Sequence, residues 1–176
     1  MGSRWHGGSG WRYGFANYSP APSVEAHLYV SNEPYPRCRP ELMSHLELVA
    51  LVVREYQPAI DFFVNVLQFE LVEDVPSLTN DGRPKRWVVV RPVGATTGIL
   101  LARADGERQA SVVGEQFAGR VGFFLRVDDF ETTHERLVVA GVRFVTAPRV
   151  EPYGKVAVFL DIEGNRWDLL GRAGGT

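Results

Sequence analysis

The chain has a single cysteine, no long hydrophobic run and no excess of charge of one sign. Cys38 alone can form neither an intramolecular disulfide nor a thiolate zinc cage, which agrees with a reducing, cytoplasmic location. The longest apolar stretch, residues 48–53, is far shorter than the ~20 residues that span a bilayer, and no signal-peptide pattern opens the chain. With 19 Lys and Arg against 21 Asp and Glu, the net charge is −2, so we expect neither membrane nor nucleic-acid binding.

Residues 1–43 have little pattern compared with the rest of the chain. They are rich in Gly, Ser, Pro and aromatic residues and show no periodicity beyond a short piece at residues 26–30. We therefore expect a poorly ordered N-terminal extension, or alternatively aromatic side chains that pack on the domain or on a partner. Patterned sequence begins directly after Met43, which is compatible with initiation at this methionine. Residues 173–176 are expected to form a short tail.

The first half of the patterned region alternates between strand and helix periodicity. Residues 46–53 (LELVALVV) are apolar and rich in β-branched side chains, which indicates a buried strand. In residues 57–67, apolar side chains recur at helical spacing, and Pro58 stands in the first turn, where proline is tolerated. Three further strands are expected, at residues 69–75, 86–91 and 98–103.

The second half repeats this order. A strand is expected at residues 121–127, a helix at residues 130–140 with Gly141 as its C-terminal cap, and strands at residues 142–145, 155–161 and 166–170. Aligning Val53 with Val127 places strand on strand and helix on helix at an offset of 74 residues. We expect a first βαβββ module at residues 44–104, a linker at 105–119 and a second module at 120–172, which pack together.

Two segments, VALVVREYQPAIDFFVNVLQFEL and DIEGNRWDLLG, together with the duplicated βαβββ order, resemble the vicinal oxygen chelate superfamily. This group includes glyoxalase I, bleomycin resistance proteins and extradiol dioxygenases. The resemblance spans residues 46–171 and implies an α+β fold in which two tandem βαβββ modules form a cupped, half-open mixed β-sheet barrel with helices outside. Members share the scaffold but differ in chemistry, so an activity has to be argued from the residues of the site.

Catalytic members hold a divalent metal through side chains of the first and fourth strands of each module. The matching positions here are Leu48, a residue near Ile99, Gly122 and Asp168, of which only Asp168 is a donor. A divalent metal normally takes three or more protein donors, so we predict no metal or other cofactor and keep Asp168 as the residual metal candidate. His45 could join it only through a strand bulge, and His134 is expected to be a solvated helix residue.

Strand alternation gathers a second set of residues around Asp168. If Asp168 faces the cup, Arg166 and Leu170 share its face, and the same reasoning places three residues from each of two other strands there. The candidate pocket residues are Asp168, Arg103, Arg126, Arg166, Phe124, Leu48 and Leu101, with Ile99 and Gly122 beside them. Apolar walls with a few polar groups are typical of small-molecule sites. The alternative is a structural ion pair between Asp168 and Arg103, Arg126 or Arg166.

Several residues outside this set also have expected positions. Trp87 and Trp167 are expected in the core, with Trp167 facing away from Asp168 under a helix, while Arg91 and Tyr153 are candidate rim residues. The linker is either a lid or a plain connection. Many relatives have glycine at the position of Gln68, so the turn there is either rearranged or strained.

Three functions remain open at this point. The first is a metal-independent protein that binds a hydrophobic or aromatic small molecule, in the manner of the drug-sequestering members of the family. The second is a metal-dependent lyase or dioxygenase with atypical ligands centred on Asp168. The third is a non-catalytic interaction domain, which would fill the cup with its own side chains. Pairing into a homodimer is compatible with each of these functions.

Overall fold

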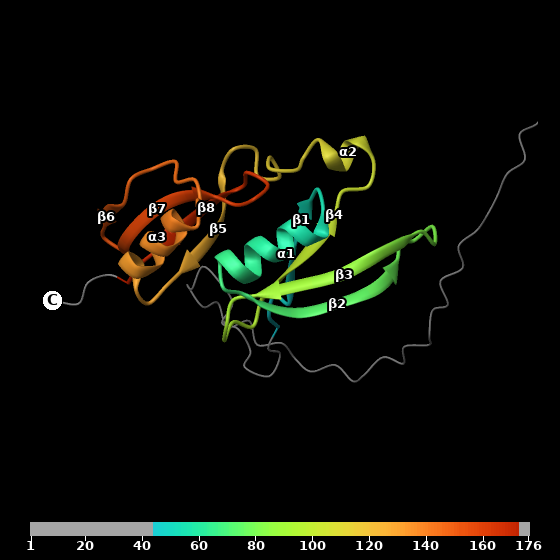
Figure 1. Ribbon diagram of the computed structural model, residues 1–176, viewed down its shortest axis with the longest axis horizontal. Coiled ribbons are helices and arrows are strands. Elements are labelled where there is room, and N and C mark those ends of the chain that lie inside the picture. The colour runs from blue at the N-terminus through green and yellow to red at the C-terminus, as the bar shows by residue number, and fades with distance from the viewer. Residues whose placement is uncertain (1–43, 173–176) are drawn as a thin grey trace, which may run out of the picture. The chain divides into compact units, whose positions relative to one another are not determined.

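A computed structural model describes residues 44–172 of the chain, and the expectations for residues 1–43 and 173–176 lie outside this range. The described region forms two successive βαβββ modules (Figure 1). Module 1 contains β1 (Leu48–Val53), α1 (Tyr56–Asp61), the π-helical turn η1 (Phe62–Val66), β2 (Glu70–Leu78), β3 (Pro84–Arg91) and β4 (Gly98–Arg103). Module 2 contains β5 (Val121–Arg126), α3 (Phe130–Val139), β6 (Arg149–Glu151), β7 (Gly154–Leu160) and β8 (Arg166–Leu170).

Each module folds its strands into one mixed four-stranded sheet. The strand order is β1-β4-β3-β2 in module 1, which we call sheet 1, and β5-β8-β7-β6 in module 2, which we call sheet 2. The two sheets therefore have the same topology. In each sheet the first and fourth strands are parallel neighbours, and the remaining pairs are antiparallel. The duplicated α+β architecture expected from the sequence repeat is therefore present.

Three elements differ in detail from the sequence expectation. The first helix changes from α to π geometry at Phe62, with the Leu67 N–H donating to the Phe62 carbonyl five residues earlier at 3.0 Å. Strand β2 runs on through Pro76, which is tolerated because β2 is an edge strand. The strand expected at residues 142–145 is wrong, because only an isolated bridge between Phe144 and Phe159 forms there and β6 lies several residues later.

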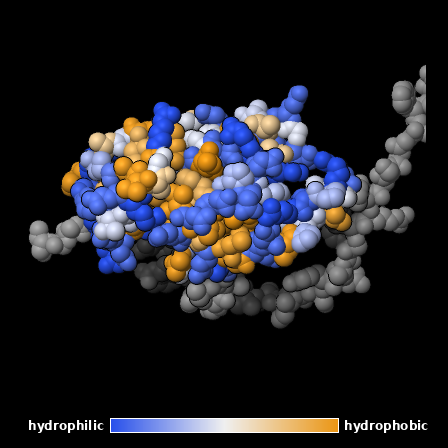
Figure 2. Space-filling model, viewed as in Figure 1, coloured by the Kyte–Doolittle hydropathy of each residue, from blue (hydrophilic) through white to orange (hydrophobic). Residues whose placement is uncertain are grey.

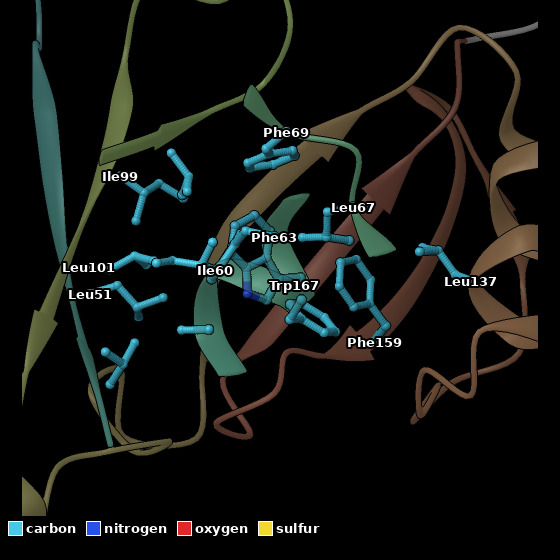
Figure 3. Close-up of a cluster of buried hydrophobic side chains, with 14 of the residues drawn as sticks. Leu51, Ile60, Phe63, Leu67, Phe69, Ile99, Leu101, Leu137, Phe159 and Trp167 are labelled. Atoms are coloured by element: carbon cyan, nitrogen blue, oxygen red, sulfur yellow. The ribbon is translucent and has the colours of Figure 1, made fainter. Parts of the chain in front are cut away.

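The core joins both modules through the first helix, which consists of α1 and η1. Figure 3 shows Ile60 and Phe63 of the first helix between Leu51 and Leu101 of sheet 1 and Phe159 and Trp167 of sheet 2. The ring centroids of Phe63 and Trp167 are 5.8 Å apart, and Leu51, Phe63, Leu101 and Phe159 are fully buried. This shared core also contains Leu137 of α3. Each sheet therefore has a helix face, which packs on the core, and an opposite face. We call this opposite face the outer face, and it is the face that the sequence analysis assigned to the cup.

The segment between the modules is held against both of them. It carries the short helix α2 (Glu107–Ala110), and beyond it the Gln116 side chain bonds two backbone groups of β1, accepting from the Val52 N–H at 2.9 Å and donating to the Ala50 carbonyl at 2.8 Å. Because β1 is an edge strand, this amide occupies hydrogen-bonding groups that a further strand would otherwise use. A Cβ on Gly114 would lie 2.3 Å from the Glu163 carbonyl oxygen, so the linker also packs tightly on module 2.

No helix within residues 44–172 has the length and apolar character needed to cross a bilayer.

Candidate functional site

The register of sheet 2 determines which residues share its outer face. Phe124 of β5 is paired with Asp168 of β8, and Asp168 is paired with Val158 of β7, so these three side chains are neighbours across the strands. The residues on either side of Asp168, Trp167 and Leu169, point to the helix face and belong to the core. Asp168 therefore lies on the outer face, with Trp167 opposite it, as the alternation of β8 predicts.

Asp168 is a buried carboxylate with apolar neighbours. The residue is 9% exposed, and its Oδ1 atom has no hydrogen-bond partner among the described residues. Val158 beside it is buried, whereas Phe124 is 65% exposed. Burial raises the pKa of Asp168 above its ordinary value, and the positive charge of Arg149 opposes part of this rise.

The nearby arginines are engaged elsewhere. Arg126 donates from Nη1 to the Gly171 carbonyl at 2.9 Å, and Arg149 donates from Nε to Glu151 Oε1 at 2.9 Å. Arg166 is exposed at the start of β8 and lines a separate small pocket beside Arg120 and Arg143. Within residues 44–172, Asp168 forms no ion pair with any Lys or Arg, so the predicted structural ion pair with Arg103, Arg126 or Arg166 is not formed there.

The sequence analysis placed Ile99, Leu101 and Arg103 of β4 on the same face as Asp168, and this expectation is wrong. Leu51 is paired with Leu101 and Val53 with Arg103, which places Ile99, Leu101 and Arg103 on the helix face. Leu101 is fully buried in the core, and the Arg103 guanidinium lies 5.8 Å from the Tyr56 ring centroid. A shift of one residue moves every side chain of a strand to the other face, and an all-apolar strand such as GILLA contains no alternation that fixes this choice.

Sheet 1 has a pocket of about 260 Å³ on its outer face. Leu48, Trp87, Val89 and Gly98 form its apolar part, and Arg91 stands beside them; the remaining lining residues are Glu47, Val72, Glu73 and Thr96. The Nε atom of Arg91 is buried without a hydrogen-bond partner among the described residues. Leu48, a candidate pocket residue, and Arg91, a candidate rim residue, both line this pocket, which does not include Asp168. Trp87 was expected in the core, although the alternation of RWVVVR puts Trp87, Val89 and Arg91 on one face.

The four positions that hold metal in catalytic relatives do not form a donor set in this chain. Leu48 and its partner Gly98 bring no donor to the outer face of sheet 1. On sheet 2 the expected third position, Gly122, has no side chain, and the strand partner of Asp168 is Phe124. Within residues 44–172, no three His, Cys, Asp or Glu side chains are arranged to hold an ion. Since one carboxylate cannot supply the usual three or more ligands, the residues present do not fit such a metal.

The two histidines of the patterned region have other contacts. His45 is exposed, and its Nε2 atom lies 2.8 Å from Glu47 Oε2. His134 is half-buried between aromatic rings, with centroid distances of 5.8 Å to Phe130 and 4.4 Å to Phe144, so it is not the fully solvated helix residue that the sequence suggested.

Comparison with known proteins agrees with this fold. A family model described as Glyoxalase/Bleomycin resistance protein/Dioxygenase superfamily matches residues 44–169. An uncharacterized protein of Shewanella frigidimarina (strain NCIMB 400) is 48% identical over 123 residues, which cover 69% of this chain and 89% of that protein.

Two solved structures are also similar. TnmS3, an antibiotic binding protein from Streptomyces sp. CB03234, is 30% identical with a TM-score of 0.59, and the match covers 74% of this chain and 98% of that one. UcmS2 is 29% identical with a TM-score of 0.62, and the match covers 73% of this chain and 98% of that one. With a family match over most of the patterned sequence and a relative of high identity, the chain belongs to the glyoxalase/bleomycin resistance protein/dioxygenase superfamily.

Proposed function

We propose that this protein binds a small hydrophobic or aromatic molecule on the outer faces of its sheets. The observation that carries the proposal is the environment of Asp168, a buried carboxylate with an unpartnered oxygen next to exposed Phe124 and buried Val158. A buried polar atom without a partner costs folding free energy, and a bound ligand that supplies the missing contact recovers that cost. Arg91 Nε on sheet 1 is a second atom of this kind and borders a pocket.

One of the similar structures supports the same function. TnmS3 is described as an antibiotic binding protein, and its similarity to this chain extends over almost its whole length. Small-molecule sites combine apolar walls with a few polar groups, which matches the apolar surroundings of Asp168 on sheet 2 and of Arg91 on sheet 1.

A homodimer is part of the proposal. The pocket of about 260 Å³ on sheet 1 is smaller than the ~300–1,000 Å³ typical of sites for drug-sized ligands. Leu71, Val75 and Leu78 of the edge strand β2 are all more than 40% exposed, and Figure 2 shows hydrophobic side chains at the surface of both modules. A second copy that covers β2 would bury these side chains and enlarge the site. Sedimentation equilibrium measures whether the chain dimerises, and a monomer at all protein concentrations would contradict the proposed homodimer.

The binding proposal is tested by a thermal-shift screen of aromatic and apolar compounds against the wild-type chain, Asp168→Ala and Glu135→Ala. A compound that binds the native state raises the melting temperature, by an amount that depends on its concentration relative to Kd. We expect compounds whose melting-temperature shift is mostly lost in Asp168→Ala and kept in Glu135→Ala. Glu135 is a suitable control because it is an exposed residue of α3 and not of the sheet. A screen without hits would contradict the proposal.

The alternative is a metal-dependent lyase or dioxygenase that uses Asp168 with atypical ligands. Elemental analysis of the purified protein separates the two functions. About one tightly bound divalent ion per chain, lost in Asp168→Ala together with turnover, would favour the enzyme over the binding protein.

A further inference from the structure

We infer that the ligand bound on the outer face of sheet 2 carries a hydrogen-bond donor, an ammonium, an N–H or a hydroxyl, that Asp168 Oδ1 accepts while an aromatic or other apolar body covers Phe124. This inference rests on the proposed binding function and specifies the chemistry that the site selects.

The first step is the unmet hydrogen-bonding capacity of Asp168. Oδ1 is buried and has no partner among residues 44–172, although an ionised carboxylate offers about four acceptor sites. The buried carboxylate of Asp161 provides a contrast in the same module, because Asp161 accepts hydrogen bonds from three backbone N–H groups and from the side chains of Asn165 and Trp167. The chain therefore satisfies one buried carboxylate fully and leaves an oxygen of the other without a partner.

The second step is the state of the cations around Asp168. Arg126 donates to the Gly171 carbonyl and Arg149 donates to Glu151, and within residues 44–172 neither guanidinium group donates to Asp168 Oδ1. Arg149 acts on Asp168 only through its charge at longer range. A ligand with a hydrogen-bond donor can therefore bind Asp168 Oδ1 without breaking an existing bond. A ligand with a carboxylate would be repelled by the negative charge of Asp168.

The third step is the surface next to the acceptor. Phe124 lies directly across the parallel β5–β8 pair from Asp168 and is 65% exposed, and Val158 lies across the antiparallel β7–β8 pair. An apolar body on the solvent side of Phe124 would remove its ring from water and at the same time shield the hydrogen bond to Asp168. The geometry selects a ligand with a donor at the edge of an aromatic or aliphatic group.

Four naphthalene derivatives test this selection, because they share one apolar body and differ in a single substituent. They are 1-naphthylmethylamine, 1-naphthalenemethanol, 1-methylnaphthalene and 1-naphthoic acid, and their Kd values are measured at neutral pH by ligand-observed NMR. We expect the amine and the alcohol to bind wild-type protein about 10- to 100-fold more tightly than the methyl compound, as one hydrogen bond to a charged group provides.

Two variants assign this preference to Asp168. In Asp168→Ala the amine and the methyl compound should bind equally, and in Asp168→Asn, which keeps an acceptor oxygen without the charge, the alcohol should keep more of its advantage than the amine. Urea unfolding verifies that each variant is folded.

The outcomes separate this inference from the proposed function. Binding of all four probes with equal affinity, tightest binding of the naphthoate, or an amine preference that survives in Asp168→Ala would overturn the inference and leave small-molecule binding intact. Failure of every probe to bind, in a protein for which the thermal-shift screen also finds no ligand, would overturn both.

Discussion

The indole Nε1 of Trp167 donates a hydrogen bond of 3.1 Å to Asp161 Oδ2, and both residues are buried. Asp161 begins the turn DIEGN, whose backbone N–H groups at Glu163, Gly164 and Asn165 all point to its other oxygen, Oδ1. The Trp167 ring stacks on Phe123, with centroids 4.3 Å apart, and contacts Phe63 of the first helix. One side chain thus connects the β7–β8 turn, sheet 2 and module 1.

Trp167→Phe should destabilise the protein by about 1–3 kcal/mol, because it removes the bond to Asp161 and part of the buried ring. Urea unfolding measures the loss. Trp87→Phe is the control, since Trp87 lies half-buried on the outer face of sheet 1 and should cost less than about 1 kcal/mol. Equal losses in the two variants would contradict the connecting role of Trp167.

Gln116→Ala should free the edge of β1. The variant loses both bonds to the strand, at the Val52 N–H and the Ala50 carbonyl, and we expect a loss of about 1–3 kcal/mol in the free energy of unfolding. Hydrogen exchange at the Val52 amide should also accelerate. Gln109→Ala serves as control, because Gln109 accepts one exposed bond from the Asp105 N–H. Unchanged protection at Val52 would show that the Gln116 side chain does not hold the strand.

Gln68→Gly should stabilise the protein by about 0.5–1 kcal/mol. Gln68 has φ 61°, a left-handed conformation that costs an L-residue more than the extra entropy glycine loses on folding. Of the two expectations for the turn at Gln68, a rearranged or a strained backbone, the structure has the strained one. The same change at Glu135, an exposed position inside α3, should destabilise by about 1 kcal/mol. If thermal or urea unfolding showed that both glycine variants lose stability, strain at Gln68 would be contradicted.

Asp168→Asn should change stability in a pH-dependent way. Burial raises the pKa of Asp168 from 3.8, so the folded protein holds this proton more tightly than the unfolded chain does. The contribution of Asp168 to wild-type stability should therefore fall as the pH rises from 3.8 through the raised pKa of the folded state. The neutral amide does not titrate, so the free energy of unfolding of Asp168→Asn, relative to wild type, should rise over that range.

The control for this titration is Asp74→Asn. The hydrogen bond from Arg86 lowers the pKa of Asp74, so its carboxylate stabilises the folded state above 3.8 and that stabilisation is lost as the pH falls. Relative to wild type, Asp74→Asn should lose stability as the pH rises through the lowered pKa of the folded state toward 3.8, which is the opposite direction. Urea unfolding at several pH values measures both, and parallel curves for the two variants would contradict the assigned causes.

The sequence predicted the duplicated fold because strand and helix periods alternate twice at one offset. It also predicted that Asp168 faces away from Trp167, since β8 alternates between polar and apolar positions, and it placed Phe124 on the face of Asp168 from the spacing of the resemblance. It failed at β4, where GILLA is apolar throughout and only the pairing of Leu51 with Leu101 fixes the face. The role of Gln116 was not predictable, because its partner Val52 lies 64 residues away and no local pattern marks that contact.

The central claim, that a small molecule binds on the outer faces of the sheets, is tested most directly by mapping where a bound probe perturbs the protein. Backbone ¹H–¹⁵N spectra recorded during titration with the highest-affinity naphthalene derivative should show the largest shifts at Phe124, Asp168, Trp87 and Arg91. Shifts confined to the helix side, along α1 and α3, or an unperturbed spectrum at saturating probe would contradict the account.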